Sequence, residues 1–125
     1  MKLLIIDTSA MLFGFSNGNN VFEMAEREVP GHKLLVSEGL INELSSISKN
    51  KGAKGMSARL ALSILKSKKI NILIDKQIVD DWILYCAKKH RGLAVITNDS
   101  ALANRLKKAG AGVYKLSRSG ILQLR

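Results

Sequence analysis

A short apolar segment that ends directly on polar residues is the feature that most constrains the fold of this chain. Residues 3–6 read Leu-Leu-Ile-Ile and are followed by Asp7 and two hydroxyl residues. An unbroken apolar run of this length is typical of a strand that is buried on both faces, as in a parallel sheet. The pattern recurs at residues 93–96, which are followed by Thr97, an asparagine and Asp99. Because parallel strands end at the same edge of a sheet, the sequence predicts two carboxylates at that edge.

The rest of the chain alternates between strand-like and helix-like segments. We expect strands at 2–6, 33–36, 70–74, 93–97 and 112–116, with a short edge piece at 120–124. Helices are expected from about residue 9, over 20–28, from an N-cap at Ser37 to 48, around 56–64, and over 77–89 and 100–109. This alternation predicts an α/β fold in one domain over residues 1–125. It would be a three-layer α/β/α sandwich around a mainly parallel sheet of about five strands, with the Asp7 strand at the centre.

The charge of the chain is divided unevenly along its length. Residues 1–48 carry three basic and six acidic residues, whereas residues 49–125 carry 17 basic and four acidic ones, so the net charge of +10 comes from the second part. Such a surplus favours a polyanionic partner, most simply a nucleic acid, over a merely solvated basic surface. The residues expected to hold its backbone are Lys49, Lys51, Lys54, Arg105, Lys107 and Lys108.

Two more acidic positions fall inside predicted helices. Glu43 lies at the edge of the apolar stripe of one helix, and the pair Asp80 and Asp81 lies near the start of another. Each acid taken alone has an ordinary explanation, since Asp7 and Asp99 suit helix N-caps and an acid within a helix is usually solvated. The joint occurrence of these acids in a basic chain is what favours a functional site.

Four segments give the chain a resemblance to a known family. They read IIDTSAML at residues 5–12, LINEL at 40–44, VDDWIL at 79–84 and VITNDSAL at 95–102. In this order and spacing they resemble the four acidic motifs of PIN-domain ribonucleases, over nearly the whole chain. The acids that match are Asp7, Glu43, Asp81 and Asp99. Asp81 is preferred to its neighbour Asp80 because an apolar Trp-Ile-Leu segment follows it.

The resemblance implies a metal-dependent endoribonuclease with a four-carboxylate site for Mg²⁺ or Mn²⁺. A divalent cation would offset the mutual repulsion of the carboxylates, would bridge to phosphate and would acidify a bound water. In the family, hydrolysis of RNA leaves a 3′-hydroxyl and a 5′-phosphate. The supporting positions beside the acids are Thr8, Ser9, Asp80 and Thr97. The three hydroxyls among them also suit hydrogen bonds to loop backbone alone.

Three roles stay open from the sequence. The basic charge and the residues of two motifs, VDD at 79–81 and TND at 97–99, favour an endoribonuclease of ribosomal RNA processing or RNA quality control. The small size favours the toxin ribonuclease of a toxin–antitoxin pair, which would have an antitoxin protein as a partner. A non-catalytic RNA-binding module is the alternative of another class, and the presence of all four acids argues against it. The resemblance also implies a homodimer.

Several other chemistries match the sequence poorly. The segment KNKGAKGMS at 49–57 does not fit a phosphate-binding P-loop, and the GAG at 110–112 lacks the third glycine of a dinucleotide site. His32 and His90 are too isolated to predict a zinc site, and the single Cys86 excludes an internal disulfide. No apolar run is long enough to span a membrane or to form an export signal, so we expect a cytoplasmic protein.

Overall fold

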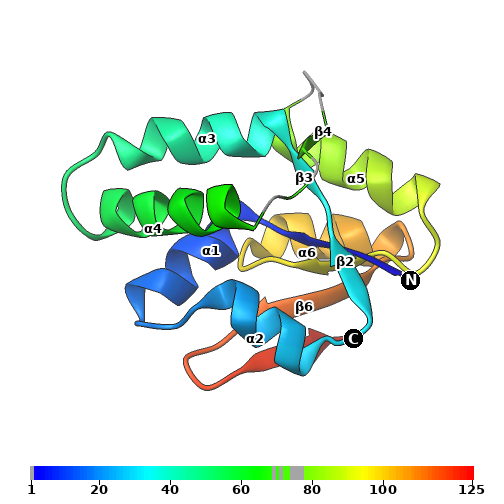
Figure 1. Cartoon of the computed structure of the whole chain (residues 1–125). Helices are drawn as coiled ribbons and strands as arrows, with labels where there is room; N and C mark the ends of the chain where they lie inside the picture. Colours follow the sequence, from blue (N-terminus) through cyan, green and yellow to red (C-terminus); the bar gives the residue numbers. More distant parts are fainter. Residues whose placement is uncertain (1, 69, 71, 74–77) are drawn as a thin grey trace.

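The computed structural model describes residues 2–68, 70, 72–73 and 78–125, and Figure 1 shows how their helices and strands are arranged. Its main feature is a five-stranded sheet in the order β2-β1-β5-β6-β7, parallel except for β7, which runs antiparallel to β6. The strands of this sheet are β1 (Lys2–Ile6), β2 (His32–Leu34), β5 (Ala94–Ile96), β6 (Gly112–Leu116) and β7 (Ile121–Leu124). The predicted α/β fold with a mainly parallel sheet is confirmed.

Strands β1 and β5 lie side by side in the interior of the sheet because they are apolar on both faces. Residues 4–6 pair in register with residues 94–96, and all six are buried. The amide of Asp7 continues the pairing by donating to the carbonyl of Ile96 at 2.9 Å. The two strands therefore end at the same edge of the sheet, as predicted.

The prediction that the Asp7 strand is central is wrong. Strand β1 is the second strand from one edge, and β5 occupies the middle of the sheet. The reason is that the chain adds two strands, β6 and β7, on the far side of β5, whereas only β2 lies beyond β1.

The strands predicted at 33–36 and 70–74 form a different arrangement. The first is divided at Leu35, whose amide donates to the carbonyl of Leu4 at 2.8 Å. Beyond it, β3 (Val36–Ser37) leaves the main sheet and pairs in parallel with β4 (Ile72–Leu73) as a separate two-stranded sheet. Residues 71 and 74 of the predicted strand lie outside the described residues.

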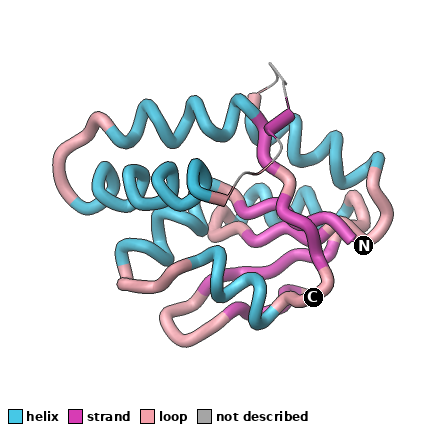
Figure 2. The backbone as a smooth tube through the Cα atoms, viewed as in Figure 1, coloured by secondary structure: helices cyan, strands magenta, loops and turns pink. Residues whose placement is uncertain are grey.

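Helices form the outer layers of the sandwich. In the described part of the chain they are α1 (Thr8–Ser16), α2 (Val21–Glu28), α3 (Glu38–Ser48), α4 (Ala53–Ser67), α5 (Val79–Lys89) and α6 (Ser100–Lys108). Helix α1 contacts α2, α3 and α4, whereas α5 packs against α6. These two groups flank the strands, which Figure 2 colours magenta. Within the described residues, no helix has the length and hydrophobicity needed to cross a bilayer.

Two local features explain where helices begin and how closely they pack. Ser37 caps α3 as predicted, because its hydroxyl accepts a hydrogen bond of 3.1 Å from the amide of Leu40. Gly14 lets α1 approach the sheet, since a Cβ atom there would lie 2.7 Å from Cδ2 of Leu116 and would overlap the side chain of Val21. The helix that follows Asp7 is thereby held tightly against β6 and α2.

Candidate active site

Asp7 lies at the end of β1 and is only 5% exposed. Its Oδ2 accepts two hydrogen bonds, one of 2.8 Å from the hydroxyl of Ser9 and one of 2.9 Å from the hydroxyl of Thr97. Asp7 occupies the N-cap position of α1, but its side chain accepts no hydrogen bond from the amides of that helix. The ordinary explanation of Asp7 as a helix cap therefore does not account for its burial or its partners.

The same two hydroxyls also hold the loop that carries Asp99. The amide of Asn98 donates to the hydroxyl of Ser9 at 3.0 Å, and the amide of Asp99 donates to the hydroxyl of Thr97 at 3.1 Å. Ser9 and Thr97 therefore bind loop backbone and the Asp7 carboxylate together. Thr8 does not join them: it is buried, and its hydroxyl has no hydrogen-bond partner among the described residues.

Asn98 is a structural residue of this loop that the sequence did not single out. Its side-chain nitrogen donates to the carbonyl of Leu116 at 3.0 Å, and its side-chain oxygen accepts from the amide of the same residue at 2.9 Å. This pair fixes the loop to the end of β6. No local pattern predicts the contact, because the two residues are 18 positions apart.

Asp99 does cap a helix. Its Oδ1 accepts a hydrogen bond of 3.1 Å from the amide of Leu102 in the first turn of α6. Capping by one oxygen fixes the orientation of the carboxylate and leaves the other oxygen for a second role. The cap is thus compatible with the ligand role that the family resemblance implies.

Asp80 is the third carboxylate of this region. Burial raises the pKa of the Asp80 carboxyl above its usual range, and the negative charges of Asp7 and Asp99 raise it further. Arg105 opposes this rise in the pKa, which places a positive charge of α6 close to the same group. We call Asp7, Asp80 and Asp99 the carboxylate cluster.

The structure separates Asp80 from the neighbouring acid that the sequence preferred. Asp81 is exposed, whereas Asp80 is half-buried and interacts with both other acids of the cluster. The reason is the rotation of α5 about its axis, because residues seven positions apart lie on nearly the same side of a helix. Asp80 is in line with the buried Ala87, and Asp81 with the exposed Lys88. The choice of Asp81 relied on the apolar residues that follow, and a site role for Asp81 stays a prediction.

Glu43 is not brought into the cluster. It lies on the exposed side of α3, whose buried residues are Leu40 and Leu44. Within the described residues, no three His, Cys, Asp or Glu side chains are gathered closely enough to hold a metal ion in this geometry. A common metal site of the four acids of the family motifs, and with it a ligand role for Glu43, stays a prediction.

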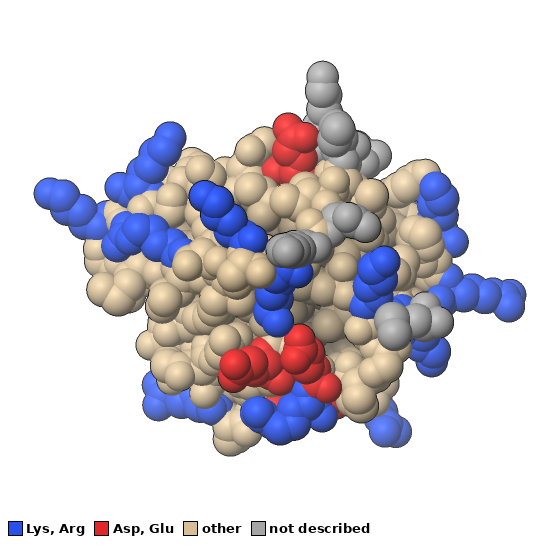
Figure 3. Space-filling model, viewed as in Figure 1, with Lys and Arg blue, Asp and Glu red and all other residues tan. Residues whose placement is uncertain are grey.

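The six predicted backbone-binding residues are all exposed, but they lie in different places. Lys49, Lys51 and Lys54 occupy the connection between α3 and α4 and the first turn of α4. Arg105, Lys107 and Lys108 lie on α6. Figure 3 shows Lys and Arg side chains spread over one face of the molecule, with a group of acidic side chains over α2. The exposed acids of that helix are Glu23, Glu26 and Glu28.

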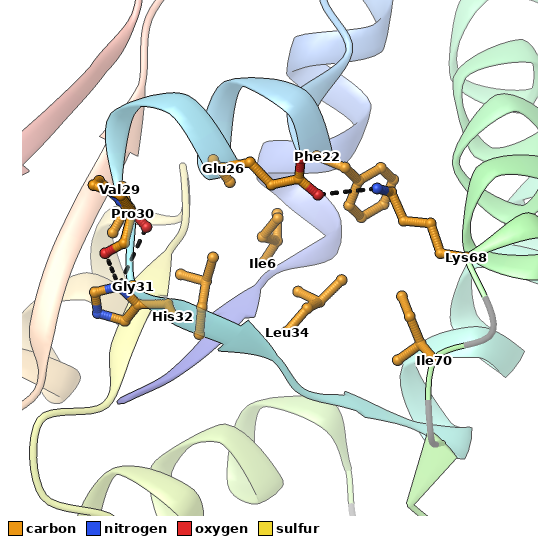
Figure 4. Close-up of a pocket in the computed structure, with 12 residues that line it drawn as sticks. Ile6, Phe22, Glu26, Val29, Pro30, Gly31, His32, Leu34, Lys68 and Ile70 are labelled. Atoms are coloured by element: carbon orange, nitrogen blue, oxygen red, sulfur yellow. Dashed lines mark hydrogen bonds and ion pairs between the residues drawn. The ribbon is translucent and has the colours of Figure 1, made fainter. Parts of the chain in front are cut away.

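A cavity of about 330 Å³, drawn in Figure 4, is not lined by any acid of the carboxylate cluster. It opens between α2, β2 and the end of α4, and its walls are mostly apolar side chains such as Phe22 and Ile6. Lys68 pairs with Glu26 across 3.1 Å at this cavity. None of the three clustered acids lines it, so the larger volume does not mark the chemical site. A smaller hollow, of about 240 Å³, adjoins the loop that carries Asp99.

Comparisons with known proteins agree with the fold. The family model of the PIN like domain matches residues 4–119. The solved structure of the PIN domain endonuclease Utp24 is similar, with a TM-score of 0.79 and 25% sequence identity over 98% of this chain and 90% of that one. No curated protein sequence matches the chain significantly. Because the family model covers nearly all of the described sequence, the chain belongs to the PIN-like domain family.

Proposed function

We propose that the protein is a metal-dependent endoribonuclease whose reacting centre is the carboxylate cluster. The observation that carries this proposal is that Asp7 and Asp99 follow the paired strands β1 and β5 and are joined by the hydroxyl of Thr97, with Asp80 near enough for their charges to act on it. Membership of the PIN-like family and the similarity to an endonuclease support a nuclease function. The basic surplus of the chain supports RNA as the substrate class.

The donor chemistry of the cluster fits Mg²⁺ or Mn²⁺. Both ions prefer carboxylate oxygens, and a divalent cation would offset the burial and the negative charges of Asp7 and Asp99 that raise the pKa of Asp80. Asp7, Asp80 and Asp99 are the residues we propose to hold the ion, although among the described residues no three such side chains stand close enough together to do so without rearrangement. When bound, it would supply a water of lowered pKa and positive charge beside the phosphate under attack.

The neighbouring residues of the chain hold these acids in position. Ser9 and Thr97 fix Oδ2 of Asp7 through two hydroxyl donors, which leaves Oδ1 of that carboxylate without a hydrogen bond to them. The hydroxyl of Thr97 also accepts from the amide of Asp99, so the first and last acids of the cluster share one positioning group. Arg105 adds a positive charge beside Asp80, where a substrate phosphate would otherwise meet only carboxylates.

A role in RNA maturation or quality control is the form of this proposal that we favour. The concentration of 17 basic residues after residue 48 suits a long or structured RNA. The toxin role, the antitoxin partner and the homodimer stay predictions. A binding module without activity is the less favoured alternative, since such a module has no need for a half-buried Asp80 whose pKa is raised by burial and by the charges of Asp7 and Asp99.

The proposal is tested by incubating the protein with a structured RNA in Mg²⁺, in Mn²⁺ and in EDTA. We expect internal cleavage in the presence of either ion, with 3′-hydroxyl and 5′-phosphate ends, and none in EDTA. End-specific enzymes identify the ends, because only a 5′-phosphate supports ligation. Binding of the RNA without cleavage in both ions would favour the non-catalytic alternative. Cleavage in EDTA would contradict the role of a metal.

A further inference from the structure

The hollow beside the Asp99 loop is lined mostly by residues outside the carboxylate cluster. Its floor is the segment 97–100, which carries Asp99 of the cluster and the Thr97 hydroxyl that donates to Asp7. One wall is a single face of α6, with residues at the helical spacing 100, 103, 104 and 107. The other wall is formed by Lys115 of β6 and Leu124 of β7. The hollow and the cluster thus lie on either side of one short loop.

Two lysines, from different elements, line this hollow. Lys107 comes from α6 and Lys115 from β6, and both are exposed. The ammonium group of Lys107 donates to a backbone oxygen of Arg125 at 3.4 Å. Within the described residues, neither lysine forms an ion pair with a carboxylate. Lys115 can therefore meet an anion in the hollow directly, and Lys107 would exchange its 3.4 Å contact with Arg125 for one to the anion.

The remaining lining suits a sugar-phosphate group. Ala103 and Leu124 supply apolar surface, and the exposed side chain of Asn104 supplies both a hydrogen-bond donor and an acceptor. The volume of about 240 Å³ is too small for a folded element and suits a group of one nucleotide. Asp99 is the one acid in the lining, and it lies on the side of the cluster.

We propose that this hollow is a subsite for the backbone of the nucleotide next to the one whose phosphate is attacked. Lys107 and Lys115 would bind its phosphate, and Asn104 would contact its ribose. The inference rests on the proposed function, because it assumes that the strand passes over the carboxylate cluster. It also divides the basic residues of α6: Lys107 faces the hollow, whereas Arg105 lies near Asp80.

The test compares two double variants that lose the same charge. K107A/K115A removes both lysine side chains, and with them their positive charges, from the subsite. The control, K2A/K33A, removes two exposed lysines from β1 and β2. These strands lie toward the opposite edge of the sheet from β6 and β7. Both are made in the Asp7→Asn background, and thermal unfolding checks that each variant folds. The probe is a fluorescein-labelled single-stranded RNA of about 12 nucleotides in EDTA, followed by anisotropy.

We expect K107A/K115A to raise the Kd by about tenfold at low salt, and the control to raise it less than about twofold. The slope of log K against log salt should become shallower by about 0.7 for each phosphate contact that is lost. K107R/K115R keeps the charge and should bind the RNA within about threefold of the parent. Equal weakening by K107A/K115A and K2A/K33A would overturn the subsite, because the lysines would then act only through net charge.

Failure of the subsite and failure of the proposed function give different results. Suppose that the parent does not cleave RNA in Mg²⁺ or Mn²⁺, but K107A/K115A still binds RNA more weakly than K2A/K33A does. The proposed nuclease activity is then wrong, and the proposed subsite is supported. If the parent cleaves RNA and the two double variants bind alike, the subsite is wrong and the hydrolysis stands.

Discussion

Thr97 donates a hydrogen bond of 2.9 Å to Oδ2 of Asp7, although 90 residues separate the two in the sequence. The same hydroxyl accepts from the amide of Asp99 at 3.1 Å. One side chain therefore joins the end of β1 to the loop after β5, and it sets the distance between two acids that belong to different strands.

Replacing Thr97 by Val should disturb the site more than the fold. Valine keeps the shape but removes the donor to Asp7 and the acceptor for Asp99, so we expect the free energy of unfolding to fall by about 1–3 kcal/mol. Cleavage should fall by about tenfold or more, since the carboxylate loses one of its two fixed contacts. Thr97→Ser keeps the hydroxyl and should recover most activity. A valine variant as active as the parent would show that this contact only stabilises the loop.

Asp7→Asn should lower the rate of RNA cleavage by about a hundredfold or more, because an amide is a poor ligand and carries no charge. The fold should be retained, since the side-chain oxygen of asparagine can still accept from Ser9 and Thr97. Without metal, the melting temperature should stay equal or rise, because one of three repelling charges is gone. The assay is single-turnover cleavage, together with calorimetry in EDTA. Full activity of this variant in Mn²⁺ would remove Asp7 from the reacting centre.

Asp80 and Asp81 provide a matched pair for testing the phase of α5. Asp80→Asn should lower cleavage by about tenfold to a hundredfold, because Asp80 is the half-buried member that interacts with Asp7 and Asp99. Asp81→Asn removes the same charge from an exposed neighbour and should leave cleavage within about twofold of the parent. The reverse order of effects would restore the assignment made from the sequence.

The stability of the parent should depend on pH through Asp80. Because the pKa of Asp80 is raised in the folded state, the folded protein binds that proton more tightly than the unfolded chain does. The free energy of unfolding therefore falls as the pH rises from the unfolded pKa of about 3.9 through the folded pKa, and the loss is complete above it. We expect Asp80→Asn to melt higher than the parent near pH 7 in EDTA. The difference should shrink as the pH is lowered through the folded pKa of Asp80 toward about 3.9, and a constant difference would contradict the shift.

Binding of RNA should depend steeply on salt. Contacts to phosphates release counterions, so the slope of log K against log salt should be about −0.7 for each phosphate neutralised on a single strand. Changing Lys49, Lys51 and Lys54 to Ala should flatten the slope and weaken binding about equally for unrelated RNA sequences. Anisotropy titrations with two RNAs of different sequence measure both effects. An affinity that does not change between low and physiological salt would show that the charge serves another partner.

The apolar runs made part of the fold predictable from the sequence. Residues 3–6 and 93–96 are unbroken apolar segments, and burial on both faces leaves them few places other than the interior of a sheet. The placement of Asp7 and Asp99 at one edge follows from that, because parallel neighbours end together. The N-cap at Ser37 was also predictable, since capping is decided within one turn of helix.

Other features depend on contacts that local patterns do not contain. The division of the predicted strand at Leu35 arises because its amide pairs with Leu4 while the next residues pair with β4. The distinction between Asp80 and Asp81 depends on how α5 is rotated against the sheet. The apolar periodicity of the helix does not decide which of these two adjacent residues faces inward. Periodicity similarly allowed Glu43 to face the sheet, and the packing of α3 leaves it exposed.

The pairing of β1 with β5 has a consequence for the order in which the protein is made. Strand β1 is synthesised first, but Thr97 follows 90 residues after Asp7. Closing so long a loop costs entropy that the completed sheet must offset, so this pairing is expected to form late. A chain that stalls during translation before residue 94 would carry the first acid of the site without β5 or the Asp99 loop. Only a polypeptide that extends past the Asp99 loop can therefore assemble the cluster, and one interrupted before it should be inert toward RNA.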